Sequence, residues 1–204
     1  MALSQISAHK SSPLSTETFL KHIQSIEPFI TVLNALTAQG IPNAWLAGGA
    51  LTQSYWNHQQ GLPWHQGVKD FDVVYFAQES IEAQRQREQQ LNATCPVAFD
   101  IDLKNQALVH TWYGQKFGHE IDPYESALEG IESWIPAFSV GIALAATSQL
   151  KLYAPFSLAD IYHQRVTPNK KVMSRQSYQA LCEGYRHRWP SIHVSPWAGD
   201  LDHF

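Results

Sequence analysis

The chain has 204 residues, of which 44% are hydrophobic and 16% are charged, and its formal net charge is −4 at pH 7. This length is sufficient for one domain with a substantial apolar core. The slightly negative charge and the lack of a long Lys/Arg run argue against a protein whose main task is to bind a nucleic-acid backbone. A local basic cleft remains possible, with Lys104, Lys116, Lys170, Lys171 and Arg175 as candidates.

Cysteine usage and hydropathy indicate the compartment. Cys95 and Cys182 are far apart in the sequence, and two such cysteines without a secretory signal are typical of free thiols in a reducing compartment. The N-terminal region lacks a basic start followed by an apolar run, so we predict no signal peptide. No segment reaches the roughly 18 apolar residues that a membrane span requires. We therefore expect a soluble, cytoplasmic protein with no membrane partner.

In chain order, the pattern alternates between helices and short strands. Residues 1–15 are Ser-rich and aperiodic and predict a loose tail, which leaves 16–204 as the domain. From Thr16, apolar residues recur at helical spacing towards Gly40 and predict one helix. The same criteria predict strands at 44–47, 70–76, 98–103, 139–144 and 150–153, and helices at 51–56, 80–92, 126–134, 158–164 and 175–188. These elements predict a single-domain α/β (α+β) protein with a mixed sheet flanked by helices.

An Asp-x-Asp pair opens the strand predicted at 70–76. Side chains at i and i+2 of a strand leave from one face, so Asp70 and Asp72 point together while Phe71 and Val73 point into the core. Like charges held this close repel unless a cation lies between them, and carboxylate oxygens suit Mg²⁺. The alternative is a pair of exposed aspartates on an edge strand, where they would discourage further strand pairing.

Gly48 and Gly49 lie between the strand at 44–47 and a helix. A strand, a glycine turn and a helix N-terminus can bind phosphate through backbone N–H groups and the helix dipole. Glycine allows the backbone to approach the phosphates closely. The alternative is a tight connection in which no side chain would fit.

A third acidic element follows in the strand predicted at 98–103. Strict alternation places Asp100, Asp102 and Lys104 on one face. A neighbouring strand could bring either aspartate against the first pair, and three carboxylates on adjacent strands can hold two metal ions about 3.5–4 Å apart for in-line attack on phosphorus. Either residue could instead be an ordinary solvent-facing strand residue.

Together these segments resemble the nucleotidyltransferase superfamily, the fold of DNA polymerase β and aminoglycoside nucleotidyltransferases. The chain looks most like a bacterial group of nucleotidyltransferases of unknown substrate. The likeness extends from about residue 45 to 190. It is carried by the glycine-turn helix at 47–57, the metal strand at 68–76, and the third-acid strand with its polar turn at 101–113. The C-terminal motifs lie at 153–158, 167–169 and 189–190.

The resemblance implies Mg²⁺-dependent transfer of a nucleoside monophosphate from an NTP, by analogy ATP, to an unknown acceptor with release of pyrophosphate. It places the third acid at Asp102, with Asp100 as the second choice, beside Asp70 and Asp72 as metal-binding and catalytic residues. The nucleotide contacts that it implies are Gly48, Gly49, Lys104 and Asn105.

One position departs from the superfamily pattern. Many members carry a serine after the glycine, where this chain has Ala50, so a hydroxyl contact to phosphate is missing. This departure favours, as one alternative, a nucleotide-binding or regulatory module without turnover. A metal-dependent phosphohydrolase that uses the same acids is another. The acceptor of a transferase could be a small molecule, a protein side chain or an RNA end.

Overall fold

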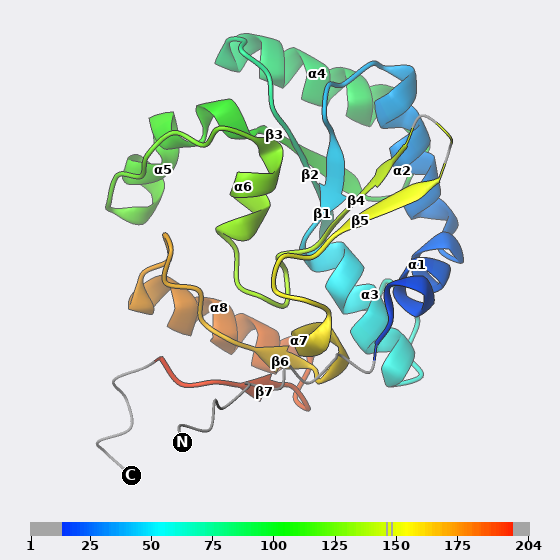
Figure 1. Ribbon diagram of the computed structural model, residues 1–204, viewed down its shortest axis with the longest axis vertical. Coiled ribbons are helices and arrows are strands. Elements are labelled where there is room, and N and C mark those ends of the chain that lie inside the picture. Colours follow the sequence, from blue (N-terminus) through cyan, green and yellow to red (C-terminus); the bar gives the residue numbers. More distant parts are fainter. Residues whose placement is uncertain (1–13, 146, 148, 198–204) are drawn as a thin grey trace, which may run out of the picture.

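The computed structural model describes residues 14–145, 147 and 149–197. Its central strands are β1 (Trp45–Ala47), β2 (Asp70–Tyr75), β3 (Asp100–Asn105), β4 (Gly141–Leu144) and β5 (Leu150–Tyr153). They form one sheet in the order β3-β2-β1-β4-β5 (Figure 1). The β2–β3 pair is parallel, and the other pairs of this sheet are antiparallel. The predicted mixed sheet with flanking helices is therefore confirmed.

Helices surround the sheet on both faces (Figure 1). Their bounds are α1 Thr16–Gln24, α2 Glu27–Ala38, α3 Gly49–Gln59, α4 Ile81–Thr94, the 3-10 turn η1 Gln106–Leu108, α5 His110–Phe117, α6 Ala127–Glu132, α7 Ala159–Tyr162 and α8 Arg175–Arg188. A separate parallel pair is formed by β6 (Arg165–Val166) and β7 (His193–Val194). Across the described residues, none of these helices is long and apolar enough to cross a membrane.

The two faces of the sheet differ in what covers them. Alternate residues of β2 are fully buried in the main core, namely Phe71, Val73 and Tyr75. Val74, on the opposite face, packs in a smaller cluster with Ile131 of α6. Because side chains alternate along a strand, Asp70 and Asp72 lie on this second face. The predicted separation of carboxylates from core residues along β2 is confirmed.

The N-terminal region differs from the prediction. The single helix expected from Thr16 to Gly40 is two helices, and Pro28 occupies the first turn of α2, where a missing N–H is tolerated. Ser15 caps α1 by accepting a hydrogen bond from the Thr18 N–H, and Leu14 is buried. The predicted tail therefore does not include these two residues, and its remainder, 1–13, lies outside the described residues.

The largest difference follows β3. The sequence predicts a strand and then a polar turn over 101–113, but the chain forms η1 and α5 directly after Asn105. The Asn105 side chain starts this change by accepting a hydrogen bond from the Ala107 N–H. The strands β6 and β7 were also not predicted, because each has only two residues, too few to show an alternating pattern.

His22 makes the stability of the fold depend on pH. Its Nε2 lies 3.1 Å from the Ser54 hydroxyl, and its ring centroid lies 5.0 Å from that of His58. Burial, and then the charge of His58, lowers the pKa of His22 to about 4. The unfolded chain therefore binds more protons than the folded chain between about pH 6.5 and 4, so stability falls as the pH falls through that window.

We expect His22 to account for a loss of about 2 kcal/mol in the free energy of unfolding between pH 7 and 4.5. Urea unfolding across this pH range measures it. His22→Gln should flatten the profile, whereas the matched change at exposed His193, His193→Gln, should leave it unchanged. An unaltered slope in His22→Gln would contradict this origin.

Candidate active site

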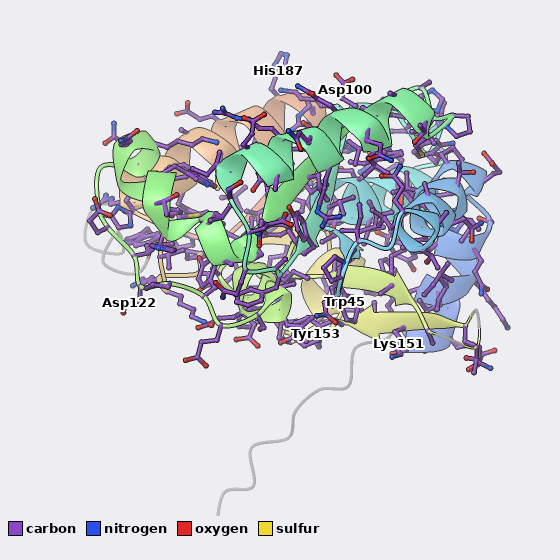
Figure 2. All side chains as sticks on the ribbon, turned by 90° about the horizontal axis from the view of Figure 1, so that it is seen from above. Trp45, Asp100, Asp122, Lys151, Tyr153 and His187 are labelled. Atoms are coloured by element: carbon purple, nitrogen blue, oxygen red, sulfur yellow. The ribbon has the colours of Figure 1, made fainter. Side chains whose placement is uncertain are left out.

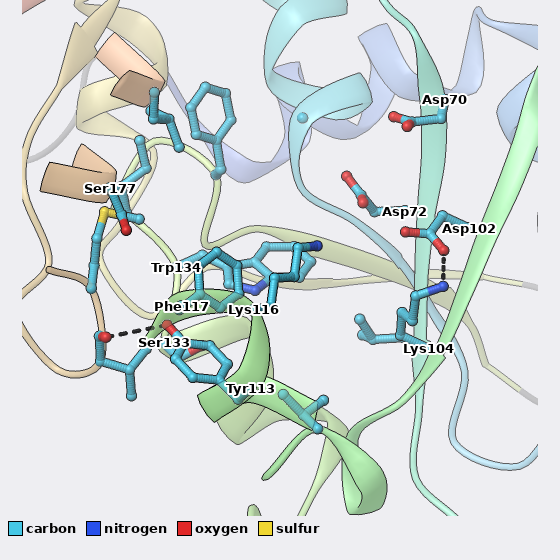
Figure 3. Close-up of a pocket in the computed structure, with 18 of the residues that line it drawn as sticks. Asp70, Asp72, Asp102, Lys104, Tyr113, Lys116, Phe117, Ser133, Trp134 and Ser177 are labelled. Carbon is cyan, nitrogen blue, oxygen red and sulfur yellow. Dashed lines mark hydrogen bonds and ion pairs between the residues drawn. The ribbon is translucent and has the colours of Figure 1, made fainter. Parts of the chain in front are cut away.

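A cavity of about 390 Å³ opens on the carboxylate face of the sheet. It is lined by β2, β3, the start of α3, α5, α8 and the segment that follows α6. Figure 3 shows Asp70, Asp72 and Asp102 on one side and the aromatic side chains of α5 on the other. The cavity therefore has a charged end and an aromatic end.

Strand pairing brings the predicted acids together. The parallel register sets Asp70 beside Asp100 and Asp72 beside Asp102. Asp70, Asp72 and Asp102 line the cavity, but Asp100 is exposed and does not (Figure 2). Because β2 lies between β1 and β3, the edge-strand explanation for the Asp-x-Asp pair is excluded.

Asp72 lies where negative charge is crowded. Burial, and then the charges of Asp70 and Asp102, raises the pKa of the Asp72 carboxyl to about 7. The Gly49 backbone N–H, which hydrogen-bonds Asp72, and the Lys104 ammonium oppose this shift. Oxygen ligands whose charges repel one another are a donor set that fits Mg²⁺, since a divalent cation would relieve the repulsion.

Asp102 interacts with Lys104. The Lys104 ammonium donates to the Asp102 carboxylate (Figure 3) and lies 3.3 Å from Glu88 Oε1 of α4. Within the described residues, no three His, Cys, Asp or Glu side chains are gathered as a complete metal site. A metal that uses all three aspartates would share Asp102 with Lys104 or displace Lys104 from it.

The glycine turn fixes the position of Asp72. Gly48 has φ = +74°, and its N–H donates to the Val140 carbonyl at 2.9 Å. A Cβ at Gly48 would lie 2.7 Å from Trp134 Cζ3 and 3.1 Å from Asp72 Oδ2. Gly49 begins α3 and lines the cavity. The turn therefore packs directly against an acid of the site and one aromatic wall.

The two other predicted nucleotide contacts have different surroundings. Lys104 lines the cavity. Asn105 is fully buried, and its side chain accepts from the backbone N–H of Ala77 and of Ala107 and donates to the Ala77 carbonyl. This amide already serves the backbone and does not line the cavity, so Asn105 is not among the proposed nucleotide contacts.

Sequence reasoning missed Arg188, which lines the cavity. Its guanidinium lies 4.6 Å from the ring centroid of Tyr185 and 4.8 Å from that of Trp189, and it donates to the Gly67 carbonyl at 2.9 Å. These contacts hold a cation at the wall of the cavity. The basic last turn of α8 was visible in the sequence, but its spacing does not show which side chain reaches the cavity.

Comparisons with known proteins bear on the fold and on the family of this chain. A solved NMR structure, described as revealing a CCA-adding enzyme head domain, matches with a TM-score of 0.74 and 21% sequence identity, covering 90% of this chain and 97% of that chain. At this identity the match establishes the fold alone. No curated protein sequence matches the chain significantly. The chain belongs to the family described as Nucleotidyltransferase, whose profile matches residues 34–194.

Proposed function

We propose that this protein transfers a nucleoside monophosphate from an NTP to an acceptor, with Mg²⁺ bound at the carboxylates. The observation that carries this proposal is the convergence of Asp70, Asp72 and Asp102 at one cavity beside the glycine turn. Family membership supports it. ATP is the donor that we propose, by analogy with the superfamily.

Each group at the charged end has a task in this reaction. Asp70 and Asp72 hold Mg²⁺, which when bound neutralises charge on the triphosphate. The Gly48 and Gly49 N–H groups already donate to the Val140 carbonyl and to Asp72. The N–H groups that follow them in α3 and the side chains of Lys104 and Arg188 therefore hold phosphate oxygens. Ala50 adds no hydroxyl, so the turn contributes through its backbone alone.

The transfer step uses an acceptor hydroxyl. Its oxygen bonds to the α-phosphorus, the bond from the α-phosphorus to the bridging oxygen breaks, and pyrophosphate leaves. Asp102 either takes the hydroxyl proton or serves as a further metal ligand. The acceptor belongs to one of three classes, a small molecule, a protein side chain or an RNA end.

Cys95 and Cys182 are free, which agrees with the cytoplasm as the site of this reaction.

The Lys104–Asp102 pair favours a second candidate function. An aspartate neutralised by lysine, together with Ala50 in the turn, suits a module that binds nucleotide without turnover. Pyrophosphate release from each of the four NTPs, with Mg²⁺ and cell extract as a source of acceptor, separates the candidates. Pyrophosphate supports the transferase, inorganic phosphate alone supports a phosphohydrolase, and nucleotide binding without either product supports the module.

The two aspartates of β3 provide a matched test of the third acid. Asp102→Asn should reduce pyrophosphate release by at least about a hundredfold, because this carboxylate lines the cavity. Asp100→Asn makes the same chemical change two residues away, at an exposed position outside the cavity, and should alter the rate by less than about twofold. The reverse order of effects would assign the third acid to Asp100.

A further inference from the structure

The short helix α5 carries an aromatic surface that the fold leaves uncovered. It contains Trp112, Tyr113 and Phe117, yet none of its residues is buried, and Phe117 is 37% exposed. The Tyr113 and Phe117 ring centroids lie 4.5 Å apart. Lys116 Nζ lies 5.6 Å from the Trp112 ring centroid and 5.3 Å from that of Phe117. Core packing does not account for an aromatic group placed in this way.

This surface belongs to the cavity that also holds the carboxylates. The three aromatic side chains and Lys116 line it. Figure 3 shows Tyr113, Lys116 and Phe117 on the side of the cavity opposite the aspartates. The Tyr113 hydroxyl donates to the Val172 carbonyl at 3.2 Å, which ties α5 to the segment before α8. Trp134, packed against Gly48, lines the same cavity. Aromatic walls therefore lie within one space shared with the proposed phosphate site.

We propose that α5 forms the nucleobase subsite for the NTP, an inference that rests on the proposed function. An NTP has a charged triphosphate at one end and a flat aromatic base at the other, and the cavity offers matching ends. Bases stack on aromatic side chains irrespective of their identity, since every base has a π face. The Lys116 ammonium adds a cation beside the stacked rings.

Binding of a nucleotide and of its phosphate chain alone distinguishes this subsite from the phosphate site. We would measure, by titration calorimetry, the affinity of each Mg²⁺–NTP and of Mg²⁺–tripolyphosphate. The variants are Phe117→Ala, which removes an exposed π face, and Phe117→Tyr, which keeps one. Phe156→Ala is the matched control, because Phe156 is 43% exposed and does not line the cavity.

We expect Phe117→Ala to weaken NTP binding about tenfold and to leave tripolyphosphate binding unchanged. Phe117→Tyr and Phe156→Ala should bind NTP within about twofold of the unmodified protein. If NTP affinity is unaltered in Phe117→Ala, the nucleobase subsite is overturned while the phosphate site stands. If neither ligand binds the unmodified protein, the proposed function fails as well.

Discussion

Replacing Asp72 by asparagine is expected to reduce pyrophosphate release at least about a thousandfold while making the metal-free protein more stable. Activity falls because Asp72 lies between Asp70 and Asp102 in the proposed metal site. Stability rises because burial, followed by repulsion from these two neighbours, raises the pKa of Asp72 from 3.8 to about 7. An ionised Asp72 therefore opposes folding, and asparagine removes that charge.

The stability effect has a defined pH dependence. A carboxyl whose folded pKa is raised destabilises the fold increasingly as the pH rises from about 4 to 7. Asp72→Asn should therefore raise the free energy of unfolding by up to about 4 kcal/mol at pH 8 and by almost nothing at pH 4. Mg²⁺ should stabilise the unmodified protein and reduce the difference.

Chemical unfolding with and without Mg²⁺, beside the pyrophosphate assay, measures both effects. Asp100→Asn is the control, because it removes an exposed aspartate of the neighbouring strand without entering the cavity. An Asp72→Asn protein that is inactive and also less stable at pH 8 would show that the carboxylate is a structural anchor. An active variant would contradict the assignment of the metal site.

Replacing Gly48 by alanine is expected to disrupt both fold and site, with a loss of about 3 kcal/mol or more in the free energy of unfolding. Two effects combine. The backbone has φ = +74°, which disfavours any residue with a Cβ, and that Cβ would lie 2.7 Å from the Trp134 ring and 3.1 Å from the Asp72 carboxylate. The ring or the carboxylate must then move, and catalysis would fall with it.

Gly40 separates the two effects. It also has a positive φ, +63°, but a Cβ there would meet nothing within 4 Å. Gly40→Ala should therefore cost about 1 kcal/mol from the backbone alone and leave pyrophosphate release unaltered. Thermal or urea unfolding of both variants measures the difference. If Gly48→Ala and Gly40→Ala lose the same free energy of unfolding, the close contact at Gly48 is relieved at no cost and does not constrain Asp72.

Local sequence patterns predicted the parts of the site that lie on strands. Alternation along 70–76 is enough to separate Asp70 and Asp72 from the buried Phe71 and Val73. The glycine pair was placed correctly at the strand–helix junction. The pairing of β2 with β3 was a hypothesis, because the order of strands in a sheet depends on contacts between distant segments.

The aromatic end of the cavity could not be predicted in the same way. Residues 106–117 form η1 and α5 because Asn105 ends the strand with a side-chain hydrogen bond, a local choice that hydrophobic periodicity does not show. Arg188 enters the site only because α8 packs near the start of β2 and the Gly67 carbonyl holds its side chain. The first feature is local but does not show in hydrophobic periodicity, and the second depends on a tertiary contact.

The most direct test of the proposed transfer is to measure into which product the α-phosphate and the γ-phosphate of ATP pass. Purified protein would be given Mg²⁺, fractionated cell extract and ATP labelled at either the α- or the γ-phosphate, beside Asp72→Asn as the inactive control. Nucleotidyl transfer predicts that α-label enters an acceptor while γ-label leaves in pyrophosphate, and only with the unmodified protein. Transfer of γ-label to the acceptor, or its release as inorganic phosphate without α-label incorporation, would contradict the account.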